Sequence, residues 1–161
     1  MKRTMLTTIF VFTLLAGLAP ASAFAFHFEG AGARIGYVDP EDSDGGLALG
    51  GHLEFESEGS QWHVRPNVYW WNGEPLSGVN LNLDAFYHFG PQSRTVPYLG
   101  AGLGMDMVEV DGPADEDSNP AVNLFGGVQI PASERATLFL EGRFVASDVS
   151  QAGLFFGFTA R

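Results

Sequence analysis

The stretch VNLNLDAFYHFG, residues 79–90, alternates between two kinds of side chain. Its two faces carry Val79, Leu81, Leu83, Ala85, Tyr87 and Phe89 on one side and Asn80, Asn82, Asp84, Phe86 and His88 on the other. Alternation with a period of two predicts a β-strand. The class of protein then depends on which face is outside. A polar exterior predicts a soluble β-domain, and an apolar exterior predicts a strand in contact with lipid.

The rest of the chain repeats this pattern, and no apolar set recurs at helical spacing after the first residues. The strands that we expect are 27–39, 46–56, 61–72, 79–90, 96–110, 121–131, 136–147 and 151–161. Short alternating runs separated by turn residues are typical of an all-β fold. Most of the runs are about ten residues long, and a tilted strand needs about 9–11 residues to cross a bilayer.

The N-terminal segment reads as a targeting sequence. Lys2 and Arg3 precede an apolar run, and Ala21, Ser22 and Ala23 supply the small residues of a cleavage site. We therefore expect a signal peptide over 1–23, with cleavage after Ala25 equally acceptable, and a single domain over 24–161. The alternative is an uncleaved membrane anchor, which the shortness of the apolar run disfavours.

The composition excludes several classes of protein. The chain has no Cys, so there is no disulfide scaffold and no thiolate site. After cleavage, six Arg stand against 19 acidic residues, a net charge of about −13 with His neutral. Such an acidic domain is a poor partner for nucleic acid, because the phosphates would be repelled.

The connections between the expected strands alternate in character. The short ones are 58–60, 91–95 and 132–135, and the mostly longer, acidic ones are 40–46, 74–78 and 113–120. Short turns at one end and longer loops at the other are typical of a transmembrane barrel. The last connection, 148–150, is short and departs from this pattern.

The side chains on the two faces favour a barrel whose outer surface contacts lipid. The polar face has no Lys and much Gly, which suits a narrow lumen filled by side chains. On the apolar face, the expected aromatic rims are Trp62, Tyr87, Phe89, Phe156 and Phe158 at one end and Tyr37 and Trp70 at the other, with Leu49, Val64, Leu83, Leu103 and Leu140 between them. The alternative is a soluble, lipocalin-like periplasmic barrel whose apolar face lines a ligand cavity.

Three stretches carry a resemblance to a known group of proteins. VPYLGAGLGM (96–105), NLFGGVQIPASERATLFLEGRFV (123–145) and GLFFGFTAR (153–161) resemble hairpins and the last strand of small outer-membrane barrels of the OmpA/OmpX type. The resemblance implies an all-β, eight-stranded antiparallel up-and-down transmembrane barrel in the outer membrane of a Gram-negative cell. It implies contact with lipid and lipopolysaccharide, and recognition by the outer-membrane assembly machinery. Such proteins commonly end in an aromatic residue, whereas here Phe158 is the last aromatic.

The inward polar face is the candidate functional site. It carries Arg34, Arg65, Arg143, Glu54, Asp84, Asp106 and Glu141, with His52 and His63 nearby. Symmetric turns would place His52 opposite Arg65, Glu54 opposite His63 and Asp84 about one pair diagonal from Arg65. Charges in a confined lumen need partners. We therefore interpret this set as a salt-bridged plug, with a narrow gated polar path as the alternative.

Other possible sites are weaker. An acyl-transferring or deacylating lipid enzyme needs Ser, His and an acid together near one rim, and His27 and His88 have no inward Ser beside them. We expect no catalysis, no cofactor and no bound metal. The acidic stretches 42–46 and 114–119 lack the full spacing of a calcium loop, and we interpret them as solvated loops. Weak bridging of divalent cations to lipopolysaccharide is the alternative.

Two local features lead to further expectations. The glycines of GAGLG (100–104) precede no helix, so they form no dinucleotide loop. We expect them to face the lumen beside Tyr98 and Phe125. Pro66 lacks an N–H in a closed sheet, which predicts a bulge at that position.

Overall fold

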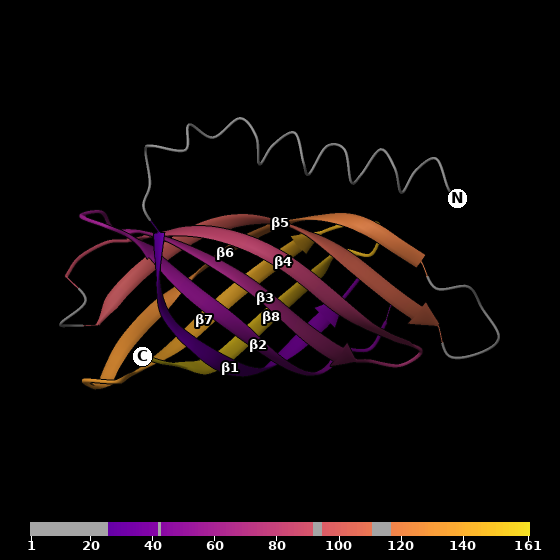
Figure 1. The fold of residues 1–161 in the computed structure, drawn as a ribbon. Coiled ribbons are helices and arrows are strands. Elements are labelled where there is room, and N and C mark those ends of the chain that lie inside the picture. The colour runs from indigo at the N-terminus through magenta and orange to yellow at the C-terminus, as the bar shows by residue number, and fades with distance from the viewer. Residues whose placement is uncertain (1–25, 42, 92–94, 111–116) are drawn as a thin grey trace.

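A computed structural model describes residues 26–41, 43–91, 95–110 and 117–161 as a closed antiparallel barrel of eight strands (Figure 1). The strands are β1 (Phe26–Pro40), β2 (Gly46–Ser57), β3 (Trp62–Asn72), β4 (Leu76–His88), β5 (Val96–Val110), β6 (Asp117–Ser133), β7 (Ala136–Ala146) and β8 (Gln151–Ala160). Each strand pairs with the next along the chain, and β8 closes the barrel on β1. The expected fold class and all eight strands are confirmed. The signal peptide expected over 1–23, and the alternative cut after residue 25, lie outside the described residues.

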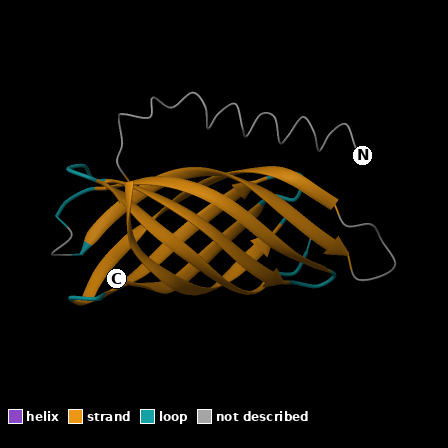
Figure 2. Ribbon diagram, viewed as in Figure 1, coloured by secondary structure: helices purple, strands orange, loops and turns teal. Residues whose placement is uncertain are grey.

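The strands are tilted about the barrel axis, and the start of β1 lies at the same end as the end of β8 (Figure 2). We call this the short-turn end, because the β2–β3 and β6–β7 turns also lie there. Within the described residues, no helix is long and apolar enough to cross a membrane. Parts of three connections, at 42, 92–94 and 111–116, lie outside the described residues.

In β4, the apolar side chains lie on the outer wall and the polar ones lie inside, as contact with lipid requires. Leu81 and Leu83 are 47% and 48% exposed on the outer wall, whereas Asn80 and Asp84 are fully buried in the interior. Large aliphatic and aromatic side chains are exposed on the other strands as well, among them Ile35, Leu49 and Leu140. The lipocalin-like alternative is wrong, because it needs the apolar face to line the cavity.

Aromatic side chains gather near both rims of this apolar wall. At the short-turn end, Tyr87 makes edge contacts with both Trp62 and Phe89. At the other end, Tyr37 and Trp70 are exposed. Phe156 departs from the expectation, because it pairs with Ile35 and Leu140 in the aliphatic middle of the wall.

The bulge expected at Pro66 is wrong. The β2–β3 pairs on either side of it, His52 with Asn67 and Phe55 with Val64, share one register, so no extra residue is inserted. The missing N–H interrupts the ladder there without displacing it. The register shifts lie instead near the short-turn end, at Glu29 in β1 and beside Pro131 in β6.

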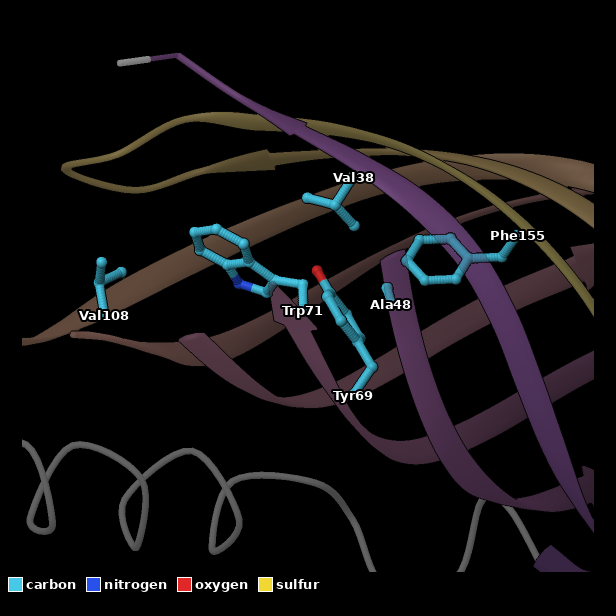
Figure 3. Close-up of a cluster of buried hydrophobic side chains, with 6 residues drawn as sticks. All are labelled: Val38, Ala48, Tyr69, Trp71, Val108 and Phe155. Atoms are coloured by element: carbon cyan, nitrogen blue, oxygen red, sulfur yellow. The ribbon is translucent and has the colours of Figure 1, made fainter. Parts of the chain in front are cut away.

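Buried apolar side chains form two clusters inside the barrel, one toward each end. One cluster consists of Val38, Ala48, Tyr69, Trp71, Val108 and Phe155 (Figure 3). The other, nearer the short-turn end, consists of Phe86, Tyr98 and Phe125.

The glycines of 100–104 make room for this packing. A Cβ on Gly100 would clash with both Phe86 and Phe125, and one on Gly102 would meet Asp84. The expectation that these glycines face bulky groups in the lumen is confirmed for Phe125. Tyr98 instead lies over Gly127 on the neighbouring strand.

Candidate functional site

Glu141 on β7 is the centre of a buried ion-pair network inside the barrel. Its carboxylate accepts hydrogen bonds from Arg34 at 3.2 Å, Arg65 at 2.9 Å and Arg143 at 3.0 Å. The hydroxyl of Tyr98 donates a further hydrogen bond to it, at 2.9 Å. One carboxylate therefore holds together three cations from β1, β3 and β7.

Two further carboxylates balance these three arginines. Glu54 accepts from Arg65 at 3.2 Å and from Gln129 at 3.3 Å. Asp84 accepts from Arg143 and, at 2.8 Å, from Asn67. Three guanidinium groups thus face three carboxylates, and all six side chains are at most 4% exposed. This balance is what a buried site requires, because an unpaired charge there would cost several kcal/mol.

Aromatic rings cover the arginines that the carboxylates hold. The guanidinium carbon of Arg65 lies 4.3 Å from the ring centre of Phe86, and that of Arg143 lies 4.5 Å from Phe125. Cation–π contacts of this kind strengthen when water is excluded. The apolar cluster at the short-turn end therefore packs directly on the charged layer.

The expected set of interior residues is confirmed with one difference in partners. Asp106 bonds to neutral groups, Asn80, Ser147 and Gln151, and to no arginine among the described residues. His52 lies against the network, where one ring nitrogen is 2.9 Å from the hydroxyl of Thr159. The interior thus contains an arginine–carboxylate layer and a separate polar layer in which Asp106 is bonded to uncharged side chains.

The expected cross-strand register of these residues is wrong. His52 lies opposite Asn67, and His63 lies opposite Glu56 instead of Glu54. The β2–β3 turn is the cause, because β2 ends at Ser57 and β3 begins at Trp62, each one residue later than expected. Asp84 lies directly opposite Arg65, not diagonal to it.

The candidate set predicted from the sequence did not include several neutral members of the network. They are Asn67, Asn82, Tyr98, Asn123 and Gln129, all buried and hydrogen-bonded to interior side chains. The sequence pattern could have identified them, since each occupies an inward position of its strand. The candidate set also did not include Glu29, which alternation along β1 places on the opposite face.

The candidate catalytic and calcium-binding groups stand apart from this network. His27 contacts Glu56, and His88 packs on His63 and Phe86; within the described residues neither ring is hydrogen-bonded to a serine. In the acidic connection after β1, the Asp44 backbone is tied to Glu74 at 3.0 Å. The acidic positions 42, 115 and 116 lie outside the described residues.

Together, the apolar wall and the sealed interior define a transmembrane β-barrel. No family model matches the chain, and no curated protein matches it by sequence. Its structure is similar to that of neisserial surface protein A, with 16% identity, a TM-score of 0.67 and coverage of 84% of this chain and 96% of that one. The N-terminal β-barrel domain of Pseudomonas aeruginosa OprF has 16% identity and a TM-score of 0.62, over 83% of this chain and 99% of that domain. The resemblance to small outer-membrane barrels is thus confirmed at the level of the fold.

Proposed function

We propose that the chain is an integral outer-membrane protein with a structural or surface-interaction role and a plugged lumen. The observation that carries this proposal is the charge-balanced network of Arg34, Arg65, Arg143, Glu54, Asp84 and Glu141, sealed inside a wall that is apolar outside. Lipid contact accounts for the wall. A lumen of eight strands filled by paired charges leaves little room for solute.

The proposed partners follow from the two surfaces. The apolar wall contacts membrane lipid, and the acidic loops at the end opposite the short turns face lipopolysaccharide or other envelope components. Divalent cations bridge those loops to lipid phosphates, since acidic loops would otherwise be repelled. The assembly machinery of the outer membrane inserts the barrel, and nucleic acid is no partner of a domain this acidic.

The location is tested by membrane fractionation combined with gel mobility of heated and unheated samples. We expect the protein in the outer-membrane fraction, with a faster-migrating folded band that shifts on heating. Recovery as a water-soluble monomer without a heat-dependent band would refute the proposal.

The plugged lumen is tested in planar bilayers. We expect no large, stable single-channel currents from the wild type, because the arginines and carboxylates neutralise each other across the lumen. Large currents would favour the alternative of a gated polar path.

Two further measurements address the remaining parts of the proposal. Lipid A should keep its mass after co-expression, since we propose no catalysis; a changed mass would identify a lipid enzyme. A chelator should increase the protease sensitivity of the acidic loops if divalent cations bridge them. Unchanged sensitivity would remove the cation bridge from the proposal.

A further inference from the structure

Three polar side chains form a row across β1, β2 and β3 at the short-turn end. His27 pairs with Glu56, and Glu56 pairs with His63 on the next strand. Directly paired residues of antiparallel strands project to the same face. His63 is fully buried in the interior, so the row lies on the inner face at the mouth of the barrel.

A β-bulge adds a fourth polar side chain to this row. The pairing passes from Phe28 with Phe55 to Gly30 with Glu54, which leaves Glu29 as the extra residue of β1. Bulges re-aim side chains, and here the carboxylate is turned to the interior, where its side chain is only 6% exposed. One carboxylate oxygen lies 3.0 Å from His63 Nδ1, and the other contacts Arg161.

The donor atoms of Glu29, Glu56 and His63 converge. All three lie within 4.8 Å of one another. One imidazole nitrogen and two carboxylates, with water in the open position, are a donor set that zinc accepts. Zinc–ligand bonds of about 2.0–2.2 Å require the carboxylates to move inward on binding.

His88 provides an independent indication of a ligand at this place. Its side chain is 1% exposed, and its ring centre lies 4.1 Å from that of His63. Neither ring nitrogen has a hydrogen-bond partner among the described residues. Buried polar groups normally have a partner, and the water ligands of an ion held at His63 would supply one.

We propose that Glu29, Glu56 and His63 bind one divalent transition-metal ion, with zinc as the best match, at the short-turn mouth of the barrel. His27 is a positioning residue, because its Nε2 lies 3.2 Å from the Glu56 carboxylate. Partners that orient a ligand in this way commonly change metal affinity when removed. The side chains of His27 and Glu56 are 49% and 34% exposed, so the ion reaches the site from solvent.

Zinc alone is the probe for the test. The purified full chain, folded in detergent, is titrated with zinc in competition with a chromophoric chelator. We expect one zinc per chain and a loss of affinity of about tenfold or more in Glu56→Gln. The matched control Glu58→Gln, in the adjacent turn and exposed, should bind as the wild type does. Calcium should not displace the zinc, because imidazole nitrogen favours transition metals.

Heat-modifiable mobility reports whether each variant is folded. Should Glu56→Gln fail to fold, Glu29→Gln provides the same test with the same expected loss. No zinc binding by the wild type, or wild-type affinity in the folded Glu variants, would overturn the proposal. A loss of affinity in Asp44→Asn alone would also overturn it, because the ion would then lie at the acidic loops of the opposite end. None of these outcomes bears on membrane location, so the proposed function is tested separately.

Discussion

Arg143 on β7 reaches across the lumen to Asp84 on β4, with Nη2 and Oδ2 2.5 Å apart. The residue directly opposite Asp84 in the sheet is a different arginine, Arg65, which turns instead to Glu54 and Glu141. Each arginine thus joins strands that are not neighbours. The ion pairs therefore cross-link the barrel through its interior as well as along its wall.

Removing Arg65 should lower the free energy of unfolding markedly and leave the conductance nearly unchanged. Arg65→Ala leaves two buried carboxylates, Glu54 and Glu141, short of a partner, and breaking a buried pair costs about 3–5 kcal/mol. Denaturant unfolding in lipid vesicles, followed by tryptophan fluorescence, measures the loss. Arg135→Ala, at an exposed turn, is the control and should cost little. Equal stability of the two variants would show that the network does not support the barrel.

Neutralising Asp84 should weaken the link between β4 and β7. Asp84→Asn keeps the shape but leaves Arg143 with Glu141 alone, and we expect a loss of about 1.5–3 kcal/mol. Asp39→Asn, on an exposed position of β1, should change the unfolding free energy by much less. A double-mutant cycle with Arg143→Ala provides the decisive measurement. Additive effects would mean that the two side chains are not coupled.

A charge on the outer wall should be costly only if lipid surrounds the barrel. Leu83 lies in the middle of β4, beside Leu103, so Leu83→Arg places a cation near the middle of the bilayer. The expected cost is about 2–4 kcal/mol in unfolding from lipid vesicles. Leu83→Ala separates the loss of side-chain volume from the effect of the charge. An arginine variant as stable as the alanine variant would contradict a membrane-spanning wall.

Two glycines provide a matched test of interior packing. Gly100→Ala brings a methyl group against Phe86 and Phe125, and overpacking typically costs about 1–3 kcal/mol. Gly142→Ala adds the same methyl group on the outer wall, where the nearest atom is a backbone oxygen 4.0 Å away. We expect Gly142→Ala to be neutral or slightly stabilising in the same unfolding measurement. A reversed order would contradict the description of a filled lumen.

The alternation of residues was sufficient to predict the strands and their two faces. In β4, the apolar and polar sets separate in the structure as they do along the chain, because successive side chains of a strand must point to opposite faces. The same rule identified Arg34, Arg65, Arg143, Glu54, Asp84 and Glu141 as interior residues. It failed for Glu29, because a bulge inserts one residue and local alternation cannot reveal that insertion.

The register could not be obtained from alternation, since a shift of two residues keeps every side chain on its face. The β2–β3 pairing differs from the expected one by this amount, so His63 is paired in the sheet with Glu56 instead of Glu54, although its ring still lies 3.5 Å from the Glu54 carboxylate. Turn geometry determines that shift, and here the turn runs on through Gln61. Alternation therefore predicts which face a side chain occupies but not which residue lies opposite it on the next strand.

The sequence by itself determined an all-β chain, its eight strands and an interior lined with paired charges, because the period of two is local and depends only on neighbouring residues. Only the tertiary structure decided which arginine meets which carboxylate. Closure of the barrel brings β7 opposite β3 and β4 across a narrow lumen, and the reach of long side chains across that space cannot be read from spacing along one strand. The bulge that turns Glu29 toward His63 was decided in the same way, by how two strands pair.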